Sequence, residues 1–295
     1  MICGGSHIAV GLIDEKWKII DFLSENLSSE EKITLNQNLV PKILEHISQI
    51  LQRNTINFGS IQSIGVACPG TIQNGMILKS GNLKLRNFPL QRMLEEKLNM
   101  PVTVRNDAKC AGLAEKQIGS LKECQDAVFL TLGTGIGGAV FMKGKLLTAT
   151  NYSGFEIGHM VINKNGRLCT CGKRGCLETY CSMKALKETI RREYGLGQDV
   201  HSQELLAILA NHSDKSEKIL QEYLNDLTVG LGNLVDFFEP EIISIGGSFA
   251  YYKTLFLPIL QEKLMQDHVF FNERKDIKLT VAELQNNAGM IGAVI

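Results

Sequence analysis

Short apolar runs alternate with stretches of helical periodicity through the first half of the chain. Strands are predicted at 63–68, at 102–105 and, as a pair around a turn at Asp14-Glu15, over 8–20. Helices are predicted over 35–51 and 89–98, and from Asp107 to Gly119. Pro41 falls inside the first helix, where we expect proline to be tolerated only near the first turn. This alternation indicates an α/β fold.

The second half continues the same pattern of apolar segments. Strands are predicted over 126–132, over the run that follows 133–138 up to a hairpin turn at Lys143-Gly144, over 241–248 and over 277–282. Helices are predicted over 177–194, 216–238 and 251–266, with a short helical tail at the end. Glycine-rich strand ends occur near 4–6 and at 133–138. We therefore expect two similar halves that face each other across a cleft.

The composition favours a two-domain cytoplasmic protein. A chain of 295 residues is long enough for two cores, and its net charge of zero gives no basic excess to attract nucleic acid or an acidic membrane surface. No apolar run approaches the roughly 20 residues of a membrane helix, and no export signal opens the chain. Eight cysteines without such a signal predict reduced thiols. Five are expected to be buried as small apolar side chains: Cys3, Cys68, Cys110, Cys124 and Cys181.

The remaining three cysteines form the most distinctive cluster in the sequence. Cys169, Cys171 and Cys176 follow His159 in a stretch whose glycines allow tight folding. One imidazole and three thiolates make the closed ligand set of a structural Zn²⁺. A disulfide, a redox pair and a chance cluster are the alternatives, but a disulfide between Cys169 and Cys171 would be strained by its short loop. We expect a zinc-bound loop that supports a site beside it.

Two glycine-rich segments follow predicted strands. Gly133, Gly135 and Gly138 match the dinucleotide fingerprint G-x-G-x-x-G, but a strand follows them instead of the helix that this fingerprint needs. A tight glycine turn exposes backbone N–H groups that suit phosphate oxygens, and an ordinary glycine-rich hairpin is the alternative. Gly246-Gly247 is either a close-approach turn for a nucleotide or a plain strand-ending turn.

Asn106-Asp107 lies where a predicted strand passes into a helix. Both residue types are common helix caps, which is one interpretation. The other is that this strand end lies in a ligand crevice, where Asp107 accepts a proton from a substrate hydroxyl. Glu156 and Glu178 on either side of the zinc cluster would accept further hydroxyl hydrogen bonds, which suits a sugar. Paired carboxylates are also typical of glycoside hydrolases, so glycoside hydrolysis is an alternative, but that reaction does not need the glycine turns.

Several motifs together resemble the ROK group of repressors, open reading frames and sugar kinases. The motifs are C-G-G-S, V-A-C-P-G-T, R-N-D-A-K-C-A-G-L-A-E, L-G-T-G-I-G-G, E-I-G-H, C-T-C-G-K-R-G-C-L-E and I-G-G-S. They span essentially the whole chain. The resemblance implies an actin-like, hexokinase-like ATPase fold, with two α/β lobes around a central cleft. We expect a smaller lobe at 1–106 with 287–295, and a larger lobe with the zinc loop at 107–286.

The resemblance also implies roles for individual residues. Asp107 would be the catalytic base. The sugar would be held by Pro69, Gly70, Asn106, Asp107, Glu156, His159 and Glu178. ATP, with Mg²⁺, would be contacted by Gly4, Gly5, Ser6, Thr134, Gly135, Gly137, Gly246 and Gly247. Zn²⁺ would be bound by His159, Cys169, Cys171 and Cys176, and the second ring nitrogen of His159 would reach a hydroxyl.

Three features depart from the pattern of the group. Its first phosphate motif reads Asp-Ile-Gly-Gly-Thr-Lys, and here Ile2 and His7 stand in place of the Asp and the Lys. The chain starts at Met1 inside what the resemblance makes a central strand, and it stops within what would be the last helix. Phe155 replaces a glycine just before the sugar-binding glutamate, which would reshape the pocket or change the sugar that fits.

The expected function is ATP-dependent phosphorylation of the C6 hydroxyl of a hexose, and within this resemblance glucose is the expected substrate. Fructose, N-acetylmannosamine, N-acetylglucosamine and allose are alternative substrates of the group, and homodimers or homotetramers are common in it. A catalytically impaired sugar sensor or regulator is the second hypothesis, because Ile2 replaces the magnesium-placing aspartate. DNA binding is not expected. The repressors of the group carry a helix-turn-helix domain ahead of the first glycine motif, and here that motif, Gly4-Gly5, stands at the start of the sequence. A redox or zinc-carrier protein would leave the glycine turns unexplained.

Overall fold

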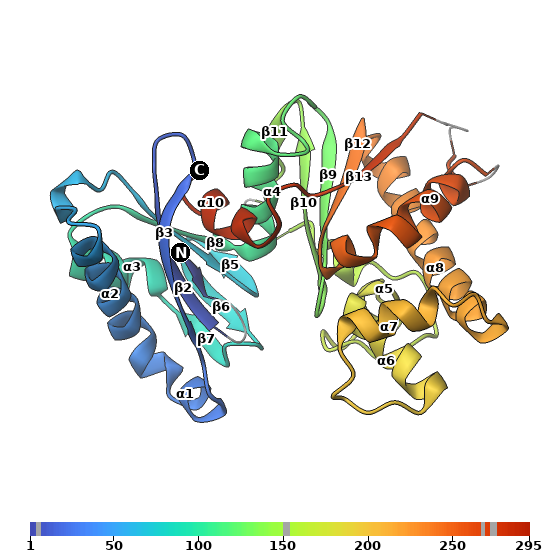
Figure 1. Cartoon of the computed structure of the whole chain (residues 1–295). Coiled ribbons are helices and arrows are strands. Elements are labelled where there is room, and N and C mark those ends of the chain that lie inside the picture. The colour runs from blue at the N-terminus through green and yellow to red at the C-terminus, as the bar shows by residue number, and fades with distance from the viewer. Residues whose placement is uncertain (4–6, 150–153, 267–268, 272–275) are drawn as a thin grey trace. The chain divides into compact units, whose positions relative to one another are not determined.

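The chain folds into two compact units, each built around a five-stranded mixed sheet (Figure 1). The computed structural model describes residues 1–3, 7–149, 154–266, 269–271 and 276–295. Unit 1 comprises Met1–Lys122, Thr148–Gly154 and Leu284–Ile295, and unit 2 comprises Glu123–Leu147 and Phe155–Glu283. Within the described residues, no helix has the length and apolar content to cross a membrane. The α/β class is the one that the sequence predicts.

The main sheet of unit 1 has the strand order β3-β2-β1-β4-β8. Its strands are β1 (Ile2–Cys3), β2 (His7–Ile13), β3 (Ile19–Asn26), β4 (Ile64–Cys68) and β8 (Val102–Asn106). β1, β4 and β8 run parallel, while β2 is antiparallel to both of its neighbours, β1 and β3. α2 (Leu35–Arg53) packs on one face, and α4 (Asp107–Ile118) and α10 (Ala288–Gly292) pack on the other. Between α1 (Ser29–Ile33) and α2, Thr34 ends one helix and begins the next.

Pro41 lies in the second turn of α2, beyond the position where we expected proline to be tolerated. Proline there removes the N–H that would bond to the carbonyl four residues earlier. Pro41 is exposed, so water can reach that carbonyl, while the opposite, apolar face of α2 keeps the helix on the sheet. The expectation was wrong because tertiary packing outweighs this local cost.

A second, three-stranded sheet in unit 1 was not predicted. It contains β5 (Thr71–Gln73), β6 (Met76–Ser80) and β7 (Leu85–Phe88), and α3 (Leu90–Leu98) follows it. The turn between β5 and β6 is Asn74-Gly75, and both residues have positive φ, at 48° and 73°. This pair is a strong hairpin signal that the sequence contained.

The sheet of unit 2 has the order β11-β10-β9-β12-β13. The strands are β9 (Ala127–Leu132), β10 (Ile136–Met142), β11 (Lys145–Leu146), β12 (Ile242–Gly247) and β13 (Lys278–Val281). Alternate residues of β9, including Val128 and Leu130, join a large apolar core with the helices. Those helices are α5 (Glu178–Cys181), α6 (Met183–Tyr194), α7 (Ser202–Leu209), α8 (Asp214–Phe238) and α9 (Lys253–Leu264).

The helix predicted over 177–194 is in fact two helices. Ser182 separates α5 from α6, and its hydroxyl accepts a hydrogen bond from the Ala185 N–H at 3.1 Å, so it caps α6. α7 was not predicted, because its apolar residues form one continuous run at 205–209 without helical spacing, and its start has no side-chain cap. The other predicted helices and strands are present, with ends shifted by a few residues, except that β3 extends six residues past its predicted end, to Asn26.

Candidate functional site

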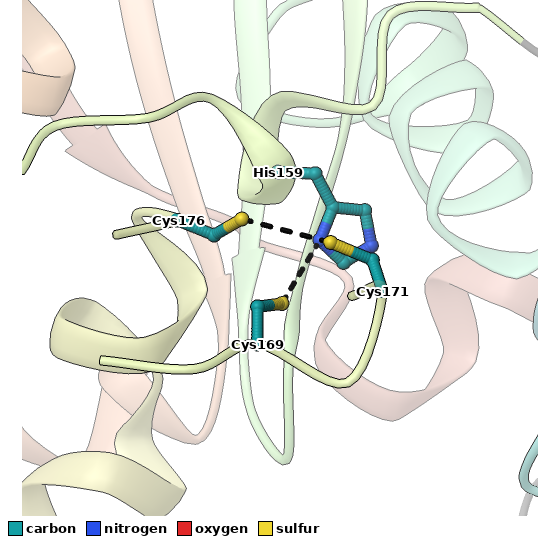
Figure 2. Close-up of side chains that lie close together, drawn as sticks. All are labelled: His159, Cys169, Cys171 and Cys176. Atoms are coloured by element: carbon teal, nitrogen blue, oxygen red, sulfur yellow. Dashed lines mark hydrogen bonds between the residues drawn. The ribbon is translucent and has the colours of Figure 1, made fainter. Parts of the chain in front are cut away.

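The four predicted metal ligands lie together in unit 2 (Figure 2). His159 ends a short 3-10 turn over Ile157–His159, and the three cysteines come from the loop that follows. The four ligand atoms all lie within 4.8 Å of one another. Cys169 Sγ is 3.6 Å from His159 Nδ1, and Cys171 Sγ is 3.7 Å from Cys176 Sγ.

Glycine conformation shapes the loop that holds these thiols. Gly172 and Gly175 have φ of 93° and 78°, which only glycine adopts without strain. A Cβ at Gly175 would lie 1.6 Å from the Asn163 carbonyl oxygen, so no other residue fits there. The Cys169 N–H donates to the Lys173 carbonyl at 2.8 Å and closes the hairpin. The spacing in the sequence therefore folds into a preformed site.

Two of the separations within the cluster match those around a tetrahedral zinc ion. With Zn–S bonds of about 2.3 Å and a Zn–N bond of about 2.05 Å, tetrahedral angles place two sulfurs about 3.75 Å apart and a nitrogen and a sulfur about 3.6 Å apart. The separations of 3.7 Å and 3.6 Å agree with these values. All eight cysteines are free thiols, which is consistent with reduced thiols and with metal ligation. The cluster is therefore consistent with a structural zinc, held through His159 Nδ1.

The surroundings of the thiols affect the pKa of each one differently. Burial, with the hydrogen bonds that its own S–H donates to the neighbouring thiols, raises the pKa of Cys176 to about 12. A thiol with such a pKa stays protonated at neutral pH unless a positive ion stabilises the thiolate. The pKa of Cys171 is lowered, although its burial acts in the opposite sense, because the backbone at Lys173 and the adjacent thiols hydrogen-bond to its sulfur.

Glu178 connects the zinc loop to the first glycine turn. It begins α5 two residues after Cys176, and its Oε2 accepts a hydrogen bond from the Ile136 N–H at 2.9 Å. A Cβ at Gly135 would lie only 2.3 Å from this oxygen. Glycine at 135 is therefore required for the carboxylate to approach the turn. Thr134 in the same turn is exposed.

The two predicted glycine turns lie at the ends of adjacent strands in unit 2. β9 and β12 are parallel, and their register pairs Gly246 with Thr131 and Gly247 with Leu132. Gly247 has a φ of 73°, and a Cβ there would lie 2.5 Å from the Leu132 carbonyl oxygen. The predicted set Thr134, Gly135, Gly137, Gly246 and Gly247 thus belongs to one edge of this sheet. Gly4, Gly5 and Ser6 lie outside the described residues.

Asn106 and Asp107 lie at the junction of β8 and α4 in unit 1. Asn106 caps the helix, because its Oδ1 accepts from the Lys109 N–H at 3.1 Å, and its Nδ2 donates to the Gly70 carbonyl at 3.0 Å. Asp107 is the first helical residue, where the helix dipole favours a negative charge. Because Cys68 pairs with Asn106 across parallel strands, Pro69-Gly70 and Asn106-Asp107 lie side by side.

Glu156 is exposed at the start of the 3-10 turn that carries His159. Phe155 before it has a φ of 59°, a left-handed conformation that a phenylalanine rarely adopts. Its ring lies against Phe238, with centroids 6.4 Å apart. The backbone at 155 therefore has the conformation of a glycine, although the side chain is aromatic.

Sequence reasoning missed a buried carboxylate that fixes the far end of α4. Glu115 is fully buried and accepts three hydrogen bonds at 2.8 Å, from the Ser120 N–H, the Ser120 hydroxyl and the Leu284 N–H. These bonds join α4 to the segment that leads into α10, and so they stabilise the helix that begins with Asp107. An acidic residue among the apolar positions of a predicted helix was the available signal.

Comparisons with known proteins agree on one family. The profile of the ROK family matches residues 2–295. The chain is 29% identical to a glucokinase of Thermotoga maritima, over 98% of this chain and 93% of that protein. It is also 29% identical to a beta-glucoside kinase of Listeria monocytogenes, over 99% of this chain and 94% of that protein. The chain spans 62% of the length of a Caldicellulosiruptor bescii xylose repressor, to which it is 29% identical over 79% of its own residues.

The fold agrees with these sequence matches. The structure of a ROK hexokinase from Thermus thermophilus superimposes with a TM-score of 0.82 at 26% identity, and covers 99% of this chain and 95% of that one. The two-lobed hexokinase-like α/β fold is therefore the one that the sequence predicted, and the relatives with this fold are sugar kinases and repressors. From the profile match over nearly every residue, we conclude that this chain belongs to the ROK family.

Proposed function

We propose that the protein is an ATP-dependent sugar kinase that phosphorylates the C6 hydroxyl of a hexose, with glucose as the first candidate. The observation that carries this proposal is Asp107, a carboxylate at the start of α4 and at the end of a parallel strand. Strand ends of this kind are where α/β sheets bind ligands. In support, a glucokinase and a beta-glucoside kinase match this chain over 98% and 99% of its residues.

In this proposal Asp107 accepts the proton of the sugar hydroxyl while that oxygen attacks the γ-phosphorus in line, the bond to the β,γ-bridging oxygen breaks, and ADP leaves. Transition states of this type are loose, so most of the catalysis is positioning and charge stabilisation. Mg²⁺ bound with ATP neutralises charge on the phosphates. Backbone N–H groups of the turns that contain Thr134 and Gly246, and of residues 4–6, would donate hydrogen bonds to phosphate and nucleotide oxygens. The C6 specificity follows from the family resemblance and remains part of the proposal.

The sugar would be oriented by side chains with hydrogen-bonding capacity to spare. Asn106 Nδ2 carries two protons, and one of them goes to Gly70. Glu178 accepts the Ile136 N–H with Oε2, and in this proposal Oε1 would accept from a sugar hydroxyl. His159 directs Nδ1 to the metal cluster, and Nε2 would bind a sugar hydroxyl. Glu156 and Pro69-Gly70 would complete the contacts. Zn²⁺ would stabilise the loop and would take no part in the phosphoryl transfer.

The test measures ADP formation with Mg²⁺ and a panel of sugars: glucose, fructose, N-acetylmannosamine, N-acetylglucosamine, allose and a β-glucoside. Asp107→Ala should reduce turnover by at least ~10², the usual scale for a lost general base, and should leave sugar binding measurable by calorimetry. Asp214→Ala is the matched control, because Asp214 is likewise the first residue of a helix. Near-normal turnover of Asp107→Ala would refute the assignment.

A sugar-binding sensor or regulator is the second candidate. Ile2 in place of the family aspartate and the similarity to a xylose repressor favour it. Sugar binding without ADP formation from any sugar in the panel would support this candidate over the kinase. We further propose a cytoplasmic location, which keeps the thiols reduced, and a homodimer or homotetramer, which light scattering would identify.

A further inference from the structure

Lys173 lies at the tip of the hairpin that carries the three cysteines of the metal cluster. Leu168 and Arg174 form an antiparallel β-bridge, so residues 169–173 make the turn between them. Lys173 is exposed at the end of this turn. It contributes no ligand atom to the cluster of Figure 2, yet it forms hydrogen bonds with three of the four ligand residues.

The backbone of Lys173 contacts two of these residues. Its carbonyl accepts a hydrogen bond from the Cys169 N–H at 2.8 Å, and its own N–H donates to the Cys171 sulfur. An N–H bond to a sulfur favours the thiolate, which is the form that binds a metal. Both bonds involve backbone atoms of Lys173, so a substitution of its side chain leaves them in place.

The side chain of Lys173 contacts the third ligand residue. Its Nζ donates to the His159 carbonyl at 2.7 Å, across 14 positions of the sequence. Backbone bonds also join the two segments at the base of the hairpin, where the Leu177 N–H donates to the Met160 carbonyl at 2.8 Å. The Lys173 ammonium joins them at the tip, and it does so at a ligand residue. It therefore holds the His159 backbone next to the cysteine turn.

The charge of this side chain is opposite to that of a zinc–thiolate cluster. Zn²⁺ with three thiolates and a neutral imidazole carries one excess negative charge. Residues 157–177 contain no Asp or Glu, and their basic residues are Lys164, Arg167, Lys173 and Arg174. The two arginines donate to carbonyls outside the ligand set, whereas Lys173 donates to His159. The Lys173 ammonium is therefore the positive charge that is bonded to a ligand residue.

We propose that Lys173 is a positioning residue of the metal site, whose ammonium holds His159 in place and offsets the negative charge of the zinc–thiolate cluster. Groups that hydrogen-bond to metal ligands orient them, and their loss commonly lowers metal affinity by about 10–100-fold. This inference does not depend on the proposed function, because it concerns the affinity for Zn²⁺, which is measured without sugar or ATP.

The test measures the Zn²⁺ affinity of the full chain by competition with a chromogenic chelator. Lys173→Met keeps the aliphatic stem and removes the charge and the bond to His159, so it should weaken zinc binding by about 10-fold. Lys173→Arg keeps a positive charge and a donor and should recover most of the affinity. Lys164→Met is the matched control, because Lys164 is an exposed lysine of the same segment, and it should leave the affinity nearly unchanged.

Salt separates the charge of Lys173 from its hydrogen bond. At 1 M ionic strength the screening length falls to about 3 Å, so the difference between Lys173→Met and the natural chain should shrink but not vanish. Equal zinc affinities for Lys173→Met and the natural chain would overturn the proposal. An equal loss in Lys164→Met would also overturn it, because the effect would then come from the charge of the whole segment. A loss that salt leaves unchanged, or that Lys173→Arg does not recover, would overturn the role of the charge.

Discussion

At Phe155, backbone strain lowers the stability of the fold and side-chain packing raises it, and substitutions can separate the two contributions. A left-handed φ costs a residue other than glycine about 1–2 kcal/mol. The contact between the rings of Phe155 and Phe238, tilted by 58°, returns about 0.5–1.5 kcal/mol beyond the area that it buries. Phe155→Gly removes both contributions, whereas Phe155→Ala removes the contact and keeps the strain. We therefore expect the glycine variant to be more stable than the alanine variant by about 1 kcal/mol.

This order is the reverse of the usual one. At an ordinary helical position, glycine is less stable than alanine by about 0.5–1 kcal/mol. Glu188 in α6 provides that ordinary position within the same unit, and its two variants lose the same exposed contact with Lys184. Calorimetry or urea unfolding of the four variants gives the comparison. A difference of 1 kcal/mol corresponds to about 2–4 °C in the melting temperature of a unit of this size.

One result would refute this reasoning. If alanine at 155 proved as stable as glycine while Glu188 showed the usual order, the backbone at 155 would not be left-handed in solution. Sugar affinity, measured on the same proteins, would then report whether the conformation of Phe155 affects the adjacent Glu156.

Three further predictions concern the metal cluster, the glycine turn and a buried thiol. Cys171→Ser should lower the zinc content below one ion per chain by elemental analysis and weaken sugar binding, whereas Cys124→Ser outside the cluster should not; an unchanged zinc content would contradict the ligand set. Gly135→Ala places a methyl group 2.3 Å from a carboxylate oxygen and should lower kcat/KM by about 10–100-fold, whereas Gly81→Ala, with no atom within 4 Å, is the control. Burial raises the pKa of Cys110 from 9.0 to about 12, so the folded chain keeps a proton that the unfolded chain releases. The contribution of the Cys110 thiol to stability is complete below pH 9 and is lost between pH 9 and 12. The melting temperature of Cys110→Ala should therefore fall less over that range than the melting temperature of the natural chain. An equal fall for the two proteins would count against the burial of this thiol.

Local patterns were sufficient for most helices and strands and for the metal ligands. The apolar spacing predicted α2 and α8 correctly because each helix buries one face against a sheet or a core. The cysteine spacing identified the cluster, because ligands so close in sequence can meet within one loop. Four of the five other cysteines are buried, as expected, and Cys124 is the partly exposed exception.

Features that depend on contacts between residues far apart in the sequence could not be predicted from local patterns. The bonds of Glu115 to Leu284 join residues far apart in sequence, and no periodicity encodes such a pair. The left-handed backbone of Phe155 could be inferred only by comparison with a glycine in relatives. The hairpin at Asn74-Gly75 is different, because its signal was local and was not used.

The hydrogen bond between Glu178 and the Ile136 amide has a thermodynamic consequence for the proposed kinase. If the sugar reorients the Glu178 carboxylate, the Ile136 amide bonded to it moves as well. The affinities for the sugar and for the nucleotide are then linked through this one hydrogen bond. Linkage is reciprocal: the factor by which sugar tightens nucleotide binding must equal the factor by which nucleotide tightens sugar binding. Glu178→Gln would weaken this shared contact and should reduce both factors equally.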